Sequence, residues 1–231
     1  MTKYIFHKDA RLVTFRSRED WLKRRTKVIT ATSAGAIMGY SPWETKMDIY
    51  MRLTRGVIKE TEETESIRKG NQFEPIARLV FAVNHPEWTL IEPPKNNWMI
   101  VRKDKPWFGA TPDGILIKGD KVVGGVECKR HQIRGKQDEE NWKEGKLPDQ
   151  YYIQVLHTGN AMKCDFYYLI AILEYQKKDE KTGEWVFGHI EYREYFFDFT
   201  EKKEELAYEE EEMEKFYQNN IKAGVMPALE F

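Results

Sequence analysis

Apolar residues follow two different patterns along the chain, and the change between them falls near residue 98. Before that point, stretches such as "EPIARLVFAVN" place apolar residues at the spacing of one helix face. After it, "CDFYYLIAIL" and "EWVFGHIEYREYFF" are rich in β-branched and aromatic residues, which favour strands. The pattern predicts helices, then a sheet, then a closing helix in "FTEKKEELAYEEEEMEKFYQNN".

Residues that begin and end helices occur within the first part. Ser17 precedes "REDWLKRR" as an N-cap, and Gly39 ends the small-residue segment "TATSAGAIMG". Ser41 with Pro42 predicts the start of a further helix. The charged run "KETEETESIRKG" predicts an exposed loop or helix edge, with the next helix starting near Pro75.

A hairpin is predicted from about residue 113 to about residue 129, because Gly119-Asp120 is a turn signal between two strand-like runs. "KKDEKTGE" predicts a second hairpin turn, and "PDQYYIQVLHTGNAM" predicts an inserted helix. No repeat or linker divides the chain. We therefore expect a single α/β (α+β) domain with a helical part over about 1–90, a sheet core over about 91–198 and a terminal helix over about 199–222.

Composition limits the possible classes of protein. The 231 residues are 41% hydrophobic and 32% charged, a soluble globular mixture. No apolar run approaches the roughly 20 residues of a membrane helix, and the first residues carry no apolar signal core, so we expect a cytoplasmic protein. The two cysteines, Cys128 and Cys164, give no disulfide framework and no cysteine metal cluster.

The charges are unevenly distributed, although the formal net charge is only −1. Residues 1–30 hold nine Lys or Arg against three Asp or Glu, and residues 199–231 hold four Lys against nine Glu. This asymmetry indicates a local polyanion site, self-association through opposite faces, or simply two solvated helix surfaces.

The predicted hairpin brings together two acids and a lysine. Asp113 opens its first strand, and Glu127 and Lys129 lie on one face near the end of its second. Two carboxylates this close favour a hard divalent cation such as Mg²⁺, and the amine can stabilise negative charge. The same pattern also suits a solvated strand face with ordinary cross-strand ion pairs.

Several ordered segments resemble the YqaJ-type viral recombinase and lambda-exonuclease family of PD-(D/E)xK nucleases. "TPDGILIKGDKVVGGVECK" is similar to the nuclease motif itself. The other matching segments are "WLKRRTKVITATSAGAIMGYSPWETKMDIYM", "GNQFEPIARLVF" and "YYIQVLHTGNAMKCDFYYLIAI". Together they span roughly residues 20 to 173 and imply a restriction-endonuclease-like mixed central sheet flanked by helices.

The resemblance implies a role for each residue of the motif. Asp113 and Glu127 would hold Mg²⁺ together with the main-chain carbonyl of Cys128, and Glu74 would support a second ion or its water. Lys129 would position the attacking water. Two Mg²⁺ ions for each active site are expected, with Mn²⁺ as a substitute.

The resemblance also implies contacts outside the motif. Gln154 would place the water or the scissile phosphate, and Arg25 and Thr32 would hold a terminal 5′-phosphate. Relatives often have Ser at the position of Thr32, so the hydroxyl is retained, and Leu156 stands where relatives often have another Gln.

Each of these residues has a simpler interpretation. Glu74, before a proline that disfavours helical geometry, would cap a helix; Gln154 would lie at the surface; Arg25 would be solvated. The two histidines that invite a catalytic role, His131 and His157, are expected to be structural. The tryptophans expected in the core are Trp21, Trp43 and Trp107.

The family implies a Mg²⁺-dependent 5′-to-3′ exonuclease. It would degrade one strand of linear double-stranded DNA and leave 3′ single-stranded overhangs for recombination by strand annealing. It also implies a homotrimeric ring, a single-strand annealing partner and the cytoplasm of a bacterial host. The alternatives are a PD-(D/E)xK endonuclease, a branched-DNA resolvase, or a non-catalytic DNA-binding accessory protein of recombination.

Overall fold

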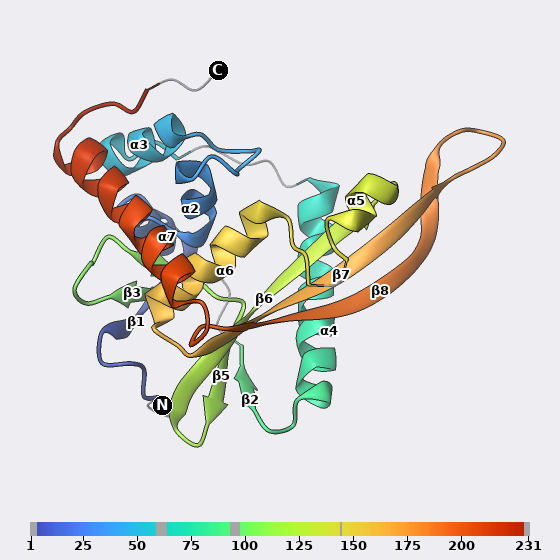
Figure 1. The fold of residues 1–231 in the computed structure, drawn as a ribbon, viewed down its shortest axis with the longest axis horizontal. Coiled ribbons are helices and arrows are strands. Elements are labelled where there is room, and N and C mark those ends of the chain that lie inside the picture. The colour runs from blue at the N-terminus through green and yellow to red at the C-terminus, as the bar shows by residue number, and fades with distance from the viewer. Residues whose placement is uncertain (1–3, 59–63, 93–97, 144, 229–231) are drawn as a thin grey trace.

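A five-stranded mixed sheet, in the order β2-β5-β6-β7-β8, forms the centre of the molecule (Figure 1). The structure is a computed structural model, and it describes residues 4–58, 64–92, 98–143 and 145–228. Strands β1, β3 and β4 form a second, antiparallel sheet. The strands are β1 (Ala10–Thr14), β2 (Thr89–Ile91), β3 (Trp98–Arg102), β4 (Gly109–Ala110), β5 (Gly114–Lys118), β6 (Lys121–Ile133), β7 (Phe166–Lys178) and β8 (Trp185–Asp198).

Helices cover both faces of the larger sheet, which confirms the expected fold class. Helix α4 packs against β6 and β7 on one face, while α6 contacts the same strands and is itself covered by α2 and α7. Beyond the helices, β7 and β8 continue as a two-stranded ribbon that projects from the body (Figure 1). The helices are α1 (Arg18–Arg25), α2 (Ala31–Ile37), α3 (Lys46–Arg55), α4 (Glu65–Asn84), α5 (Lys136–Glu140), α6 (Asp149–Met162), α7 (Lys203–Phe216) and the π-helical turn η1 (Tyr217–Lys222).

The predicted hairpin is confirmed as β5 and β6. Gly119 turns the chain at φ +67°, a left-handed conformation that suits glycine. The strands are antiparallel, with Gly114 opposite Val126, so the residue before β5 returns to the middle of β6. β6 then pairs in parallel with β7 after a crossover through α5 and α6.

Gly124 and Gly125 allow β6 to lie close against aromatic rings of β7. A Cβ atom at Gly124 would lie 2.6 Å from the Phe166 ring, and one at Gly125 would lie 2.6 Å from the Tyr167 ring. Such distances exclude a side chain unless a neighbour moves. The two glycines therefore position the strand that carries Glu127.

Two predicted helix starts are wrong. α4 begins at Glu65 and continues through Pro75, with Thr64 as its N-cap. Proline removes one helical hydrogen bond, but packing of the helix against the sheet outweighs this local cost. The charged run "KETEETESIRKG" therefore includes the first turns of α4, from Glu65 onward. Its residues 59–63 lie outside the described residues.

Helix α3 starts later than the Ser41-Pro42 signal predicts. It begins at Lys46, because Thr45 and Asp48 form a reciprocal capping box. Ser41 instead holds a turn, since its Oγ accepts hydrogen bonds from the main-chain nitrogens of Trp43 (3.3 Å) and Glu44 (3.2 Å). β1 is a further departure, because it is a strand within the part expected to be helical and pairs with the distant β3.

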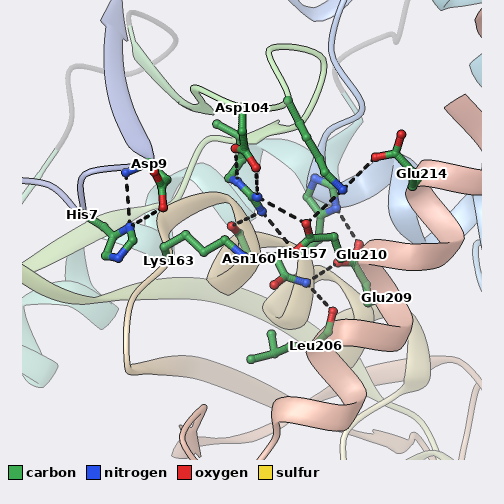
Figure 2. Close-up of polar contacts among 12 residues, drawn as sticks. His7, Asp9, Asp104, His157, Asn160, Lys163, Leu206, Glu209, Glu210 and Glu214 are labelled. Atoms are coloured by element: carbon green, nitrogen blue, oxygen red, sulfur yellow. Dashed lines mark hydrogen bonds and ion pairs between the residues drawn. The ribbon is translucent and has the colours of Figure 1, made fainter.

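Helix α7 is fastened to the body by charged side chains around Glu210 (Figure 2). Arg102 Nη1, Lys105 Nζ and Lys163 Nζ lie 3.1, 3.0 and 3.0 Å from its carboxylate oxygens. Burial raises the pKa of Glu210, but hydrogen bonds from these cations outweigh it and lower the pKa to about 2.

Replacing Glu210 with glutamine is expected to destabilise the protein at neutral pH but much less in acid. Because the folded pKa lies below the unfolded value, the carboxylate stabilises the fold above about pH 4.5, and this is lost as pH falls toward 2. Glu210 is partly exposed, so we expect a loss of about 1–3 kcal/mol at pH 7. Urea unfolding of both proteins at pH 7, 5 and 3 measures it, and an equal difference at all three pH values would contradict it.

Candidate active site

The turn of the β5–β6 hairpin brings Asp113 to the middle of β6. The Asp113 nitrogen donates to the Val126 carbonyl at 3.0 Å, and the Cys128 nitrogen donates to Asp113 Oδ2 at 2.7 Å. The carboxylate of Asp113 is thus held against the Cys128 peptide, next in sequence to Glu127. Two acids separated by 14 positions in sequence share one site, as the sequence predicted.

Lys129 is fixed beside Glu127. Its Nζ donates to Glu127 Oε1 at 2.7 Å, and both side chains are largely buried. The same Nζ lies 5.3 Å from the centre of the Tyr151 ring on α6, a favourable cation–π distance. The amine therefore has a defined position between an acid and an aromatic face.

The protonation of Asp113 and of Lys129 depends on the charges around them. Burial, and then the negative charge of Glu127, raise the pKa of Asp113 well above its usual value. Burial alone would lower the pKa of Lys129, but Glu127 and Asp113 attract its charge and raise its pKa instead. Two carboxyl groups thus stand beside one amine, and a bound cation would favour the ionised form of Asp113.

Glu74 reaches this site from α4, but in contact with an arginine. Arg78, one turn further on, makes an ion pair with Glu74 and lies 3.2 Å from Glu92 Oε2. Its Nη1 also donates to the Asp113 carbonyl at 3.4 Å. The helix through Pro75 directs Glu74 toward Asp113, and the negative charge of Glu74 contributes to the raised pKa of Asp113.

A cavity of about 240 Å³ adjoins these groups and is lined by Glu74, Asp113, Glu127, Cys128 and Lys129, among others. In the part of the chain that the structure describes, no three acidic, His or Cys side chains are grouped to hold a metal by themselves. Asp113 and Glu127 nevertheless provide the one or two carboxylates that typically hold Mg²⁺ along with carbonyl and water ligands. The chemistry of this donor set fits a hard divalent cation.

The other three predicted residues line a second, larger cavity of about 940 Å³. Arg25, Thr32 and Gln154 converge there from α1, α2 and α6. Thr32 is exposed, whereas Gln154 is only 5% exposed, so the simpler interpretation of Gln154 as a surface residue is wrong. The predicted residues thus form two groups, one at the acids and one at the basic cavity.

Arg25 lies with its guanidinium 4.7 Å from the centre of the Trp21 ring. Burial, followed by repulsion from Arg52, lowers the pKa of Arg25 to about 10, and Glu44 partly opposes this change. Arg25 is therefore still charged at neutral pH, within a cavity that Arg18 and Arg52 also line.

Sequence reasoning did not identify Arg52 or assign a role to Trp43. Arg52 is buried, lies 2.8 Å from Glu44 Oε1 and donates to Ser33 Oγ. The local signal for it was a charged residue one helical turn after Asp48 in the mainly apolar segment "MDIYMRL". Trp43 was expected in the core, but it is 65% exposed because the Ser41 turn holds it outside α3.

The remaining aromatic and histidine predictions agree with the structure. Trp21 is buried, and Trp107 packs against the core and stacks on Tyr217 at 4.2 Å between ring centres. His131 bonds to Asp138 at 2.8 Å, and His157 is fully buried in a bond to Glu209. Neither histidine lines the two cavities described above.

Fold comparison places the chain with alkaline exonucleases of known structure. It is similar to the alkaline exonuclease LHK-Exo of Laribacter hongkongensis, with a TM-score of 0.54 and 18% identity over 90% of this chain and 100% of that one. The complex of LHK-Exo with dAMP gives a TM-score of 0.53 and 17% identity, over the same shares of the two chains. At these identities the likeness shows the fold.

Residues 20–160 match the YqaJ-like viral recombinase domain, and the chain belongs to that family. The uncharacterized protein YqaJ of Bacillus subtilis (strain 168) is 23% identical over 146 residues, which make up 61% of this chain and 41% of that protein. The match thus spans about two-fifths of the relative's length. The expected family and fold class are confirmed. None of the described helices has the length and apolar character to cross a membrane.

Proposed function

We propose that this protein is a metal-dependent exonuclease that degrades one strand of linear double-stranded DNA from its 5′ end. The product would carry 3′ single-stranded overhangs for recombination by strand annealing. One observation carries the proposal: the β5–β6 hairpin groups Asp113, Glu127 and Lys129, and a separate basic cavity holds Arg25 and Thr32. The first group suits phosphodiester cleavage, and the second suits recognition of a chain end.

Asp113, Glu127 and the Cys128 carbonyl would hold Mg²⁺, or Mn²⁺ in its place, with Glu74 supporting a second ion. When bound there, the metal ion would act as a Lewis acid that activates water and neutralises phosphate charge. Lys129, fixed by Glu127 at 2.7 Å, would orient that water and stabilise the negative charge that develops on the phosphate oxygens. Gln154 lines the basic cavity with Arg25 and Thr32, and from there it would contact the scissile phosphate.

Recognition of the end would rest on Arg25 and Thr32. A terminal phosphate monoester carries more negative charge than an internal diester and exposes more oxygen acceptors. A guanidinium and a hydroxyl in one cavity suit this group. These contacts would direct the same catalytic group to chain ends rather than to internal bonds.

The natural partners would be double-stranded DNA ends and a single-strand annealing protein, with the chain acting as a homotrimeric ring in the cytoplasm of a bacterial host. A ring suits a chain whose net charge is only −1, because enclosure can retain DNA without a strongly basic surface. The family description, a viral recombinase domain, supports a role in recombination. A monomer that still degraded long duplexes without dissociating would contradict the ring.

The test compares linear duplexes that carry either a 5′-phosphate or a 5′-hydroxyl, with each strand labelled separately. We expect loss of the 5′-phosphorylated strand in Mg²⁺, slower loss from the 5′-hydroxyl end, and no degradation with a chelator. Covalently closed circular DNA serves as the control and should remain intact. Cutting of the circle would favour an endonuclease, and the absence of any degradation in Mg²⁺ would favour the non-catalytic accessory protein.

A further inference from the structure

The larger cavity contains an aromatic side chain that the proposed mechanism leaves without a role. Trp43 lines this cavity together with Arg25 and Thr32, yet 65% of its surface is exposed. Trp21, in the same lining, is only 7% exposed. The main chain at Trp43 is fixed by the Ser41 hydroxyl, so the indole is presented from a defined turn rather than from a free loop.

Three buried polar atoms in the same lining have no hydrogen-bond partner among the described residues. Trp21 Nε1 and Arg52 Nε are donors and Gln154 Oε1 is an acceptor, and the three residues are 7%, 7% and 5% exposed. A buried polar group without a partner is costly, so such atoms mark places where a ligand or water completes the structure. A ligand that satisfied all three would have to accept and donate hydrogen bonds, as a nucleotide does and a phosphate dianion does not.

Charge and size favour the same ligand. Three arginines, Arg18, Arg25 and Arg52, line the cavity against two acids. Three positive charges against two negative ones leave one positive charge in excess at the cavity, where Glu44 pairs with Arg52 and Asp48 accepts from the Thr45 cap. The volume of about 940 Å³ is at the upper end of small-molecule pockets and exceeds the needs of a phosphate group alone.

We propose that this cavity holds the whole terminal nucleotide of the 5′ strand, with its base stacked on Trp43. The inference rests on the proposed function, because it assigns the phosphate of that nucleotide to Arg25 and Thr32. Stacking on an aromatic face accepts any base, since every base has a π-face. Separating the base from its pair costs energy, and the stack on Trp43 offsets that cost.

The test is a double-mutant cycle that removes the tryptophan and the base separately. Wild type and Trp43→Ala each act on 5′-phosphorylated duplexes that end either in a normal nucleotide or in an abasic residue, and kcat/KM for release of the first nucleotide is measured. Trp43→Ala should lower this value about ten-fold on the normal duplex, the effect of losing one base–aromatic stack. On the abasic duplex, which has no terminal base to unpair or to stack, Trp43→Ala and wild type should have equal kcat/KM, and on the normal duplex Trp43→Phe should retain most of the activity.

Trp185→Ala is the matched control, because Trp185 is another exposed tryptophan (42%) but lies on the β7–β8 ribbon away from the cavity. It should leave kcat/KM unchanged. Full activity of Trp43→Ala on the normal duplex, or an equal loss on both duplexes, would overturn the stacking inference while leaving the exonuclease intact. If wild type degrades none of the phosphorylated linear duplexes, the proposed function fails instead, so the two failures are distinguishable.

Discussion

Replacing Asp113 with asparagine is expected to slow strand degradation by about 10²–10³-fold without loss of stability. Asparagine keeps an oxygen that can accept the hydrogen bond from the Cys128 nitrogen, but it removes the charge that would help to hold a metal. It also removes repulsion, because burial and the charge of Glu127 make ionisation of Asp113 unfavourable in the folded protein. The free energy of unfolding should therefore stay the same or rise.

Two measurements separate this catalytic role from a structural one. Single-turnover degradation of a labelled linear duplex gives the rate, and urea unfolding gives the stability. Asp120→Asn, at the exposed turn of the same hairpin, is the control and should change neither. A wild-type rate in Asp113→Asn, or a loss of stability that accounts for the lost activity, would show that the acids serve only the fold.

The hairpin at the centre of this site was predictable because its signals are local. Gly119 marks the turn, and the alternation of side chains along β6 places Glu127 and Lys129 on one face. The antiparallel return of the hairpin then brings Asp113 and Glu127 near each other in space. No distant partner had to be identified.

Elements that depend on tertiary packing were not predictable in the same way. α4 continues through Pro75 because it packs against the sheet. From the sequence alone, the proline predicts a helix start or a break at this position. β1 is a five-residue strand whose partner, β3, lies more than 80 positions away in the sequence. Sequence signals for such pairings are weak, because side-chain packing rather than backbone preference decides them.

The basic cavity also depends on packing between residues that are distant in the sequence. Arg25, Thr32 and Gln154 were selected by resemblance, and packing of α1, α2 and α6 brings them to one cavity. The burial of Arg52 depends on Glu44 and Ser33, which precede it by 8 and 19 positions. The exposure of Trp43 depends on a side-chain turn that displaced the expected helix start.

The other prediction with a large effect concerns the buried pair of His157 and Glu209, which joins α6 to α7 (Figure 2). His157 Nε2 lies 3.1 and 3.2 Å from the carbonyls of Ile29 and Gly109, so it must carry a hydrogen and donate. On the other side of the ring, Nδ1 lies 2.7 Å from Glu209 Oε1. Asn160 Nδ2 donates to the second carboxylate oxygen at 2.7 Å.

Replacing Glu209 with alanine is expected to lower the free energy of unfolding by about 3–5 kcal/mol, because buried His157 Nδ1 would lose its partner and Asn160 Nδ2 would keep only the Leu206 carbonyl. Urea unfolding measures the loss, with Glu211→Ala on the exposed side of α7 as the control, expected within about 0.5 kcal/mol of wild type. A loss below about 1 kcal/mol would show that the pair contributes little.

The effect of Glu209→Ala should extend to function, since His157 also donates to the Ile29 carbonyl, directly before the Thr30 cap of the helix that carries Thr32. Weaker binding of 5′-phosphorylated ends by the folded variant would therefore connect the C-terminal helix to the basic cavity.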